Sequence, residues 1–257
     1  MTAETLLFLV GSLAFTTVQS QSPEMVTARL PIAKYVSATS NAPIKKRVES
    51  IGVDVTAKSA VVIDLASGEV LFSKDSDTAY PIASLTKLIS VSTLLDQKLD
   101  LDEKIAITKA DAGYARAIFF QGETFTRREL IKAMLVGSSN EAANALARTS
   151  PGGYDAFIAK MRVKARDMGM RRAEFYDAAG LDPRNKATAQ DIAFALKAAM
   201  NYPEVREVMG MQSVDLKNTI GPKPYRVTAT NLLLTSELNK GEYKIIAAKT
   251  GTLPESG

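Results

Sequence analysis

The chain has 257 residues, of which 46% are hydrophobic and 23% are charged, so it can form one or two hydrophobic cores but not three. It contains no histidine and no cysteine, which excludes Ser-His-Asp and Cys-His catalysis, zinc sites built on these side chains, and disulfide scaffolds. The formal net charge is +4, and the short basic groups are scattered without interleaved aromatic residues. We therefore expect no nucleic-acid partner.

The N-terminal part of the chain predicts a targeting segment and a linker. Residues 6–15 form a short apolar run before a polar stretch, which predicts a signal peptide over residues 1–20 and export to the periplasm or the extracellular face of the cytoplasmic membrane. Glu4 and the absence of Lys or Arg before this run leave a buried N-terminal helix as the alternative. Residues 21–57 contain three prolines and predict a linker or loosely packed arm. No second apolar span follows, so we expect at most peripheral membrane association.

From residue 59 onward the sequence predicts a hairpin, a block of helices and a returning strand. Residues 60–65 and 69–73 are extended runs around an Ala-Ser-Gly turn. A buried helix opens at Ser84, which caps it. Further helices are expected to begin at Thr126 and near Asn140 and to span 155–168 and 188–200. Residues 243–249 predict a strand that runs into Thr250. This order indicates an α/β arrangement with the helical block inserted in the chain order of the sheet.

Ser84 and Lys87 stand three positions apart at the predicted helix start, so their side chains lie on one face of the first turn. A serine nucleophile needs a base. In a chain without histidine, a lysine can serve if burial and nearby positive charge lower its pKa. The alternative interpretation is an N-cap serine followed by an ordinary surface lysine.

Two further triplets could contribute to the same site. Ser138-Ser139-Asn140 lies between two predicted helices, where hydroxyl and amide groups could point into a cleft or form a capping turn. Lys249-Thr250-Gly251 ends the last predicted strand. It would place a cation, a hydroxyl and a side-chain-free backbone beside a substrate on that edge, or simply end the strand in a turn.

Taken in this order, the three motifs resemble the signature of penicillin-binding proteins and class A β-lactamases. They are Ser84-x-x-Lys87, Ser138-Ser139-Asn140 and Lys249-Thr250-Gly251. The surrounding stretches PIASLTKL (81–88), LVGSSNEAA (135–143), AGLD (179–182) and TNLLL (230–234) resemble the D-alanyl-D-alanine carboxypeptidase family of low-molecular-mass penicillin-binding proteins. The resemblance covers residues 58–257. It implies a serine DD-peptidase domain of the penicillin-binding-protein/β-lactamase-like transpeptidase fold. This α/β fold has an antiparallel sheet with a mostly helical subdomain inserted at about 98–230.

The resemblance also implies roles for the first two triplets. Ser84 attacks the carbonyl between the two terminal D-alanines of a peptidoglycan stem peptide, and Lys87 takes its proton. Ser138 relays a proton to the leaving amine, and Asn140 positions Lys87 and the substrate amide. β-Lactams would acylate the same serine and act as inhibitors. No metal or organic cofactor is required by this chemistry.

The last triplet would bind the end of the substrate. Lys249 and Thr250 hold the substrate carboxylate in the chemistry that the resemblance implies, and Gly251 keeps the backbone open beside it. The backbone N–H group of Thr252 joins that of Ser84 in an oxyanion hole.

Three alternatives to the carboxypeptidase remain open. The stretch PGGYDAF (151–157), followed by MGM (168–170), is similar to the endopeptidase branch of the family, which acts on crosslinked peptidoglycan. A class A-like β-lactamase would need a glutamate to activate water. Glu237 lies only ten residues before Lys249, which indicates a coincidental match, and Glu174 is better placed but lies in a stretch that resembles the carboxypeptidases. A cell-wall binding module would retain the pocket without turnover.

The end of the sequence departs from the family pattern. Six residues follow Gly251, whereas the family continues with further strands and a C-terminal helix. The strand predicted at 243–249 would then expose an unpaired edge. We expect the chain to be a fragment of a longer reading frame that is poorly folded alone.

Overall fold

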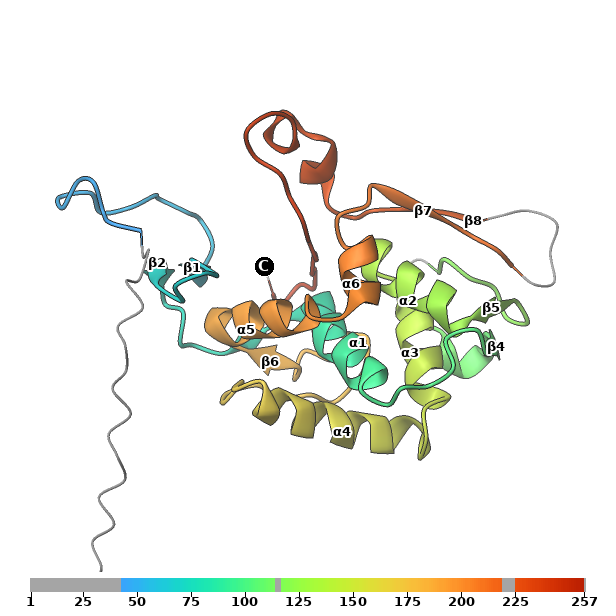
Figure 1. Cartoon of the computed structure of the whole chain (residues 1–257). Coiled ribbons are helices and arrows are strands. Elements are labelled where there is room, and N and C mark those ends of the chain that lie inside the picture. Colours follow the sequence, from blue (N-terminus) through green and yellow to red (C-terminus); the bar gives the residue numbers. More distant parts are fainter. Residues whose placement is uncertain (1–42, 114–116, 219–224, 257) are drawn as a thin grey trace, which may run out of the picture. The chain divides into compact units, whose positions relative to one another are not determined.

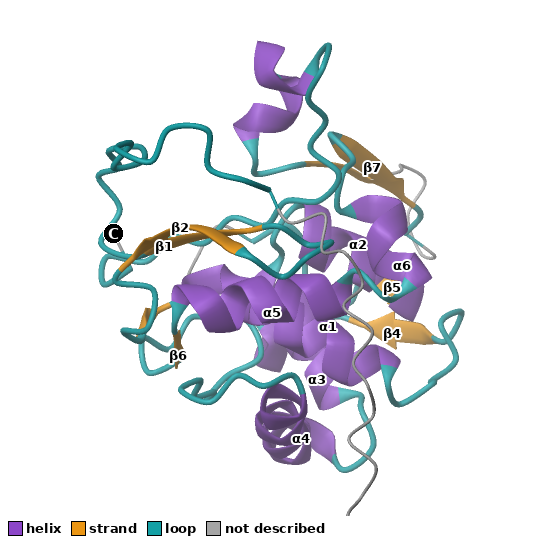
Figure 2. Ribbon diagram, turned by 60° about the vertical axis from the view of Figure 1, so that its left-hand side comes forward, coloured by secondary structure: helices purple, strands orange, loops and turns teal. Residues whose placement is uncertain are grey.

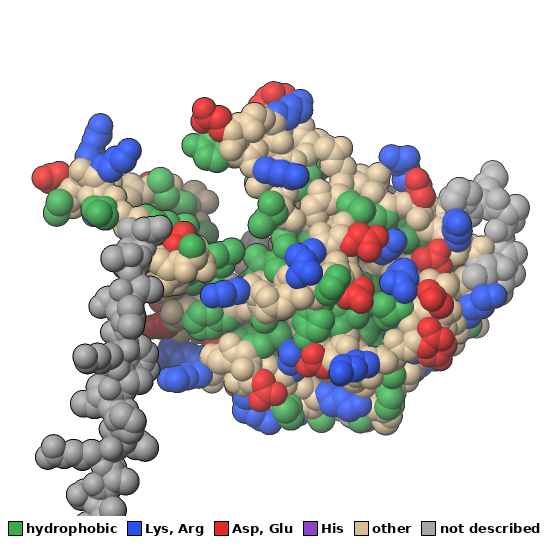
Figure 3. Space-filling view, viewed as in Figure 1, with side chains coloured by type: hydrophobic (Ala, Val, Ile, Leu, Met, Phe, Trp, Pro, Cys, Tyr) green, Lys and Arg blue, Asp and Glu red, His purple; other side chains and the backbone are tan. Residues whose placement is uncertain are grey.

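The computed structural model describes residues 43–113, 117–218 and 225–256 (Figure 1). The predicted signal peptide and most of the predicted arm lie outside the described residues, and residues 41–257 group into one structural unit. Among the described helices, none has the length and apolar character needed to cross a membrane. The face of this unit in Figure 3 carries basic and acidic side chains interspersed.

The predicted hairpin is confirmed as strands β1 (Ala60–Ile63) and β2 (Val70–Lys74), which pair antiparallel. Its turn is held by the Asp64 carboxylate, which accepts hydrogen bonds from the backbone N–H and the hydroxyl of Ser67. This is the local bonding that makes Asp and Ser frequent in turns. The hairpin lies on helix α5 (Ala189–Ala199), as Figure 2 shows.

The other strands form three further antiparallel pairs, so the described residues contain four separate two-stranded sheets rather than the single sheet that was predicted. These pairs are β3 (Tyr80–Pro81) with β6 (Lys186–Ala187), β4 (Lys104–Ala106) with β5 (Thr124–Thr126), and β7 (Ser213–Leu216) with β8 (Tyr225–Thr228).

The strand predicted at 243–249 is wrong, because residues 243–253 have no regular secondary structure. A strand is stabilised by a ladder of hydrogen bonds to a neighbouring strand. Backbone N–H groups of this segment donate elsewhere: Ala248 N to Met209 O, and Ile245 N to the side chain of Asn239. In Figure 1 the segment, in red, descends as an irregular chain.

The predicted helices are present, with bounds that differ by a few residues. They are α1 (Lys87–Leu95), α2 (Arg127–Val136), α3 (Asn140–Arg148), α4 (Gly153–Asp167), α5 and the additional α6 (Pro203–Val208). Helix α1 packs against α2, α3, α4 and α5 (Figure 2). Every residue from Lys87 to Leu94 is buried, because α1 is covered on all sides. Any polar side chain at the start of α1 is therefore inside the protein.

Capping boxes fix where two of these helices begin. The hydroxyl of Thr126 accepts from Glu129 N at the start of α2, and the hydroxyl of Thr188 accepts from Asp191 N at the start of α5. In both, the acidic side chain accepts from the backbone N–H of the threonine. Each box satisfies two backbone donors that the helix itself leaves unpaired.

We expect Thr188→Ala to destabilise the protein by about 1 kcal/mol, because Asp191 N loses its acceptor. For a domain of this size the midpoint of thermal unfolding should fall by about 2–4 °C, measured by calorimetry. Thr188→Ser keeps the hydroxyl and is the matched control. Equal midpoints for the alanine and serine variants would contradict the role of the cap.

Candidate active site

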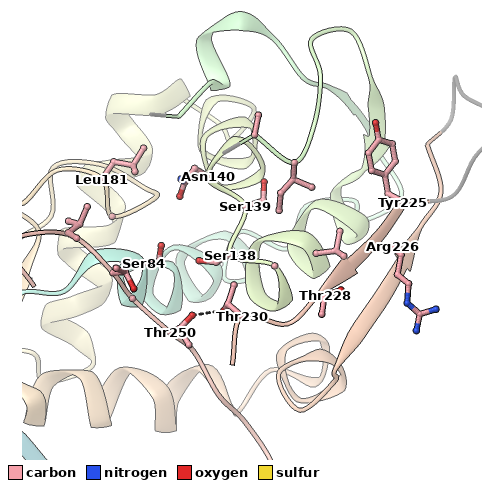
Figure 4. A pocket seen from close by; sticks show the side chains of 18 residues that line it. Ser84, Ser138, Ser139, Asn140, Leu181, Tyr225, Arg226, Thr228, Thr230 and Thr250 are labelled. Atoms are coloured by element: carbon pink, nitrogen blue, oxygen red, sulfur yellow. Dashed lines mark hydrogen bonds between the residues drawn. The ribbon is translucent and has the colours of Figure 1, made fainter. Parts of the chain in front are cut away.

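Ser84 lies on a single 3₁₀ turn, Ala83–Thr86, directly before α1. The turn has no side-chain cap, so the interpretation of Ser84 as an N-cap is wrong. Ala83 has φ +48°, in the left-handed region that residues other than glycine rarely adopt. Such a conformation costs about 1–3 kcal/mol and is common at functional sites. Figure 4 shows Ser84 among the residues that line a cavity.

Lys87 is fully buried, which overturns the alternative of a surface lysine. Its Nζ lies 2.8 Å from Ser84 Oγ, 2.8 Å from Asn140 Oδ1 and 2.5 Å from the carbonyl oxygen of Ala179. The amine of Lys87 therefore connects the Ser84-x-x-Lys87 motif to the Ser138-Ser139-Asn140 triplet.

The surroundings of Lys87 favour its neutral form. Burial is the main cause that lowers the pKa of Lys87 well below its ordinary value of 10.5, and the positive charge of Lys249 lowers it further. The carboxylates of Asp177 and Glu141 act in the opposite direction. A neutral amine within hydrogen-bond distance of Ser84 Oγ has the geometry and the protonation state of a general base.

The second lysine, Lys249, connects its own triplet to the Ser138-Ser139-Asn140 triplet. Its Nζ donates to Ser138 Oγ and to the carbonyl oxygen of Thr250, each at 2.8 Å. Burial lowers the pKa of Lys249 to about 7. Ser138 has φ +58° and, like Ala83, lies in the left-handed region. Ser139 instead caps α3 by accepting from Ala142 N, so capping in this triplet belongs to its middle residue.

The cavity has a volume of about 980 Å³. Six of the eight residues predicted from the sequence line it, and the two lysines bond to lining residues from behind. The six are Ser84, Ser138, Asn140, Thr250, Gly251 and Thr252. Strand β8 lines one side of the cavity, and Leu181 lies on the other side near Asn140, as Figure 4 shows. All eight predicted residues therefore belong to one site.

Gly251 has a packing role beside the nucleophile. A Cβ atom at this position would lie 2.9 Å from the carbonyl oxygen of Ile82, a contact that real Cβ atoms essentially never make. Only glycine lets the segment 249–252 pass this close to the turn that carries Ser84. This close approach keeps the Lys249-Thr250-Gly251 triplet beside the turn that carries Ser84.

Neither glutamate considered for a β-lactamase is placed at the cavity. Glu174 is exposed and pairs through its backbone with Lys186, and the Glu237 side chain bonds Lys240 on an exposed turn. The described residues that line the cavity include no aspartate or glutamate. No carboxylate in the described lining is thus available to activate water beside Ser84.

Three features of the site were not predicted from the sequence. The carbonyl of Ala179 is a backbone group and is invisible in residue types. Asn185, fully buried behind the site, is one asparagine among many. Strand β8 was missed, although the alternation of exposed and buried residues in its partner Ser213–Leu216 is a signal for such a hairpin.

Comparisons with known proteins agree with this geometry. A family model described as D-alanyl-D-alanine carboxypeptidase matches residues 44–257. The chain is 32% identical to a D-alanyl-D-alanine endopeptidase of Pseudomonas aeruginosa, over 89% of this chain and 72% of that protein. It is 27% identical to a D-alanyl-D-alanine carboxypeptidase of Bacillus subtilis, over 69% of this chain and 47% of that protein.

Solved structures resemble the chain as well. A mutant of the Streptomyces K15 DD-transpeptidase superposes with a TM-score of 0.72 at 26% identity, over 79% of this chain and 84% of that one. Penicillin-binding protein D2 of Listeria monocytogenes, in its cefotaxime-bound form, gives 0.67 at 28% identity, over 80% and 83%. The predicted fold class is confirmed.

We expect Lys249→Met to raise the pKa of Lys87. The positive charge of Lys249 disfavours a second ammonium nearby, so its removal makes the charged form of Lys87 less costly. Titration of the side-chain nitrogens by ¹⁵N NMR measures the shift directly. Lys240→Met, at an exposed lysine paired with Glu237, is the control. An unchanged or lower Lys87 pKa in Lys249→Met would refute this coupling.

Proposed function

The chain belongs to the D-alanyl-D-alanine carboxypeptidase family, and from this membership we propose that Ser84 cleaves the bond between the two terminal D-alanines of peptidoglycan stem peptides. The predicted family and its enzyme class, the serine-type D-Ala-D-Ala carboxypeptidases, are confirmed. The single observation that best supports the proposed nucleophile is the buried amine of Lys87, 2.8 Å from Ser84 Oγ.

The proposed reaction begins with proton transfer from Ser84 to Lys87, while Ser84 Oγ attacks the peptide carbonyl. Asn140 accepts a hydrogen bond from Lys87 and so holds the amine at this distance. The negative oxygen that develops on the substrate would be bound by the backbone N–H groups of Ser84 and Thr252, which both line the cavity.

The second half of acylation releases D-alanine. Ser138 would pass a proton to the leaving amine, supplied from the ammonium group of Lys249 or Lys87. Lys249 and Thr250 would bind the carboxylate of the leaving D-alanine, because a hydroxyl that lines the cavity, with a cation bonded to the adjacent lining residue Ser138, matches that group. Water then hydrolyses the acyl-enzyme and frees Ser84.

Endopeptidase action on crosslinked peptidoglycan is the second candidate. The observation that favours it is the name of the Pseudomonas aeruginosa relative, which matches over 89% of this chain. Both activities break a bond after a D-alanine carbonyl, so the same Ser84 and Lys87 would serve either one.

The proposed partners follow from the same chemistry. Stem peptides ending in D-Ala-D-Ala are the substrates, and β-lactams are inhibitors that acylate Ser84. Penicillin-binding protein D2 of Listeria monocytogenes, which has a similar fold, has been solved in a cefotaxime-bound form. The family acts on the cell wall, outside the cytoplasm. We propose that this chain works in the periplasm or at the outer face of the cytoplasmic membrane, with peripheral association at most.

Incubation with benzylpenicillin should increase the intact mass of the chain by the mass of one penicillin. Ser84→Ala should show no increase, because the attacking oxygen is gone. Ser73→Ala, at an exposed hairpin serine, is the matched control and should be labelled as the parent is. Failure of the parent chain to gain mass, or labelling of Ser84→Ala, would contradict the proposed nucleophile.

The two candidate activities are separated by their substrates. A carboxypeptidase releases D-alanine from a monomeric pentapeptide, whereas an endopeptidase converts a crosslinked dimer into monomers. We expect the pentapeptide to be cleaved, and chromatography with mass spectrometry measures both products. Conversion of the dimer alone would reject the carboxypeptidase and favour the endopeptidase.

A further inference from the structure

The loop of residues 177–185, here called the clamp loop, lines the cavity with Gly180 and Leu181 and contacts the segment that carries Ser84 and Lys87. Its backbone carbonyls accept three hydrogen bonds from that segment and its flanks: from Lys87 Nζ to Ala179 O (2.5 Å), from Ser90 Oγ to Ala178 O (2.7 Å), and from Ile82 N to Asn185 O (3.0 Å). One loop thus holds residues before and after the turn Ala83–Thr86 that carries Ser84.

Gly180 sets how closely the clamp loop approaches. It has φ +83°, and a Cβ atom there would lie 1.9 Å from the carbonyl oxygen of Ala83. The loop is therefore in direct contact with the strained residue before Ser84. Small displacements of the loop would be transmitted to the turn, because no gap separates them.

Asn185 closes the clamp loop. Its side chain is fully buried, and its Oδ1 accepts from Tyr176 N at 2.6 Å and from Asp177 N at 3.3 Å. Its Nδ2 donates to Asp177 O at 3.0 Å and to the hydroxyl of Thr86 at 3.1 Å. The Thr86 bond ties the loop to the residue directly before Lys87. A buried amide with all its partners in place fixes geometry strongly.

The position of Ala179 O decides where the Lys87 amine can accept a proton. A neutral lysine amine has two N–H groups and one lone pair. Asn140 Oδ1 and Ala179 O can only accept hydrogen bonds, so they occupy the two N–H groups. The lone pair is then left for the third neighbour, the hydroxyl of Ser84.

We propose that Asn185 is a positioning residue for the reaction, because its bond to Thr86 holds the clamp loop where Ala179 O directs the lone pair of Lys87 at Ser84. This inference rests on the proposed function, in which Lys87 is the base. Asn185 does not line the cavity, so it acts through Lys87 and not on the substrate.

The test compares Thr86→Val with Thr86→Ser in the full chain. Valine removes the acceptor of Asn185 Nδ2 and keeps the shape, and Nδ2 retains Asp177 O as a partner. Serine keeps the acceptor. Stopped-flow acylation by a chromogenic β-lactam separates the acylation rate constant from the dissociation constant of the initial complex. We expect Thr86→Val to lower the rate constant about tenfold with an unchanged dissociation constant, since small misplacements of a base are costly.

Further variants identify the residue responsible. Asn185→Ala removes the bond to Thr86 together with the other bonds of this side chain, so it should lower the acylation rate constant at least as much as Thr86→Val. The double variant should lose little more than Asn185→Ala, because the bond to Thr86 is already absent. Asn201→Ala, at an exposed asparagine, should behave as the parent. Thr86→Ser should retain at least half of the parental rate constant.

Each other outcome has a defined meaning. Equal rate constants for Thr86→Val and Thr86→Ser would overturn the role of Asn185 and leave the proposed function intact. A smaller labelled fraction at an unchanged rate constant would also overturn it, since it indicates a loss of folded protein alone. Absence of acylation in the parent chain would overturn the proposed function and this inference together.

Discussion

The site depends on a lysine amine buried at the start of α1 with only neutral groups in hydrogen-bond contact. A buried ammonium without a paired carboxylate is costly, so the protein lowers that cost by favouring the neutral amine. Burial of the Lys87 amine, which is costly for its charged form, therefore produces a base in a chain that has no histidine. The surroundings of α1, covered by helices on all sides, are what make this possible.

Backbone conformation contributes as much to the site as side-chain identity. Ala83 and Ser138 both have left-handed φ angles; Ala83 directly precedes Ser84, and Ser138 lines the cavity between α2 and α3. Strain of this kind persists only where the surrounding packing determines the chain path. The helices around α1 supply that packing, and the close approach of Gly251 to Ile82 leaves the catalytic turn little freedom.

Much of the architecture could be predicted because its signals are local. The Asp64–Ser67 turn and the capping box of Thr126 each depend on residues within a few positions of one another. The strand predicted at 243–249 failed because strand formation depends on a distant partner, which a single run of residues does not reveal. Ser84 illustrates the same limit. Its local sequence suggested an N-cap, whereas its role depends on Lys87, whose amine also bonds Asn140 on another helix.

The two lysines of the site act on each other in a way that suits the proposed reaction. In the free protein, the charge of Lys249 helps to keep Lys87 neutral, so the base is ready before substrate arrives. A substrate carboxylate bound at Lys249 would cancel that charge and raise the affinity of Lys87 for a proton. The base would thus become stronger at the moment when Ser84 must lose its proton. Binding of the substrate carboxylate and activation of Ser84 would then both follow from the interaction between Lys249 and Lys87.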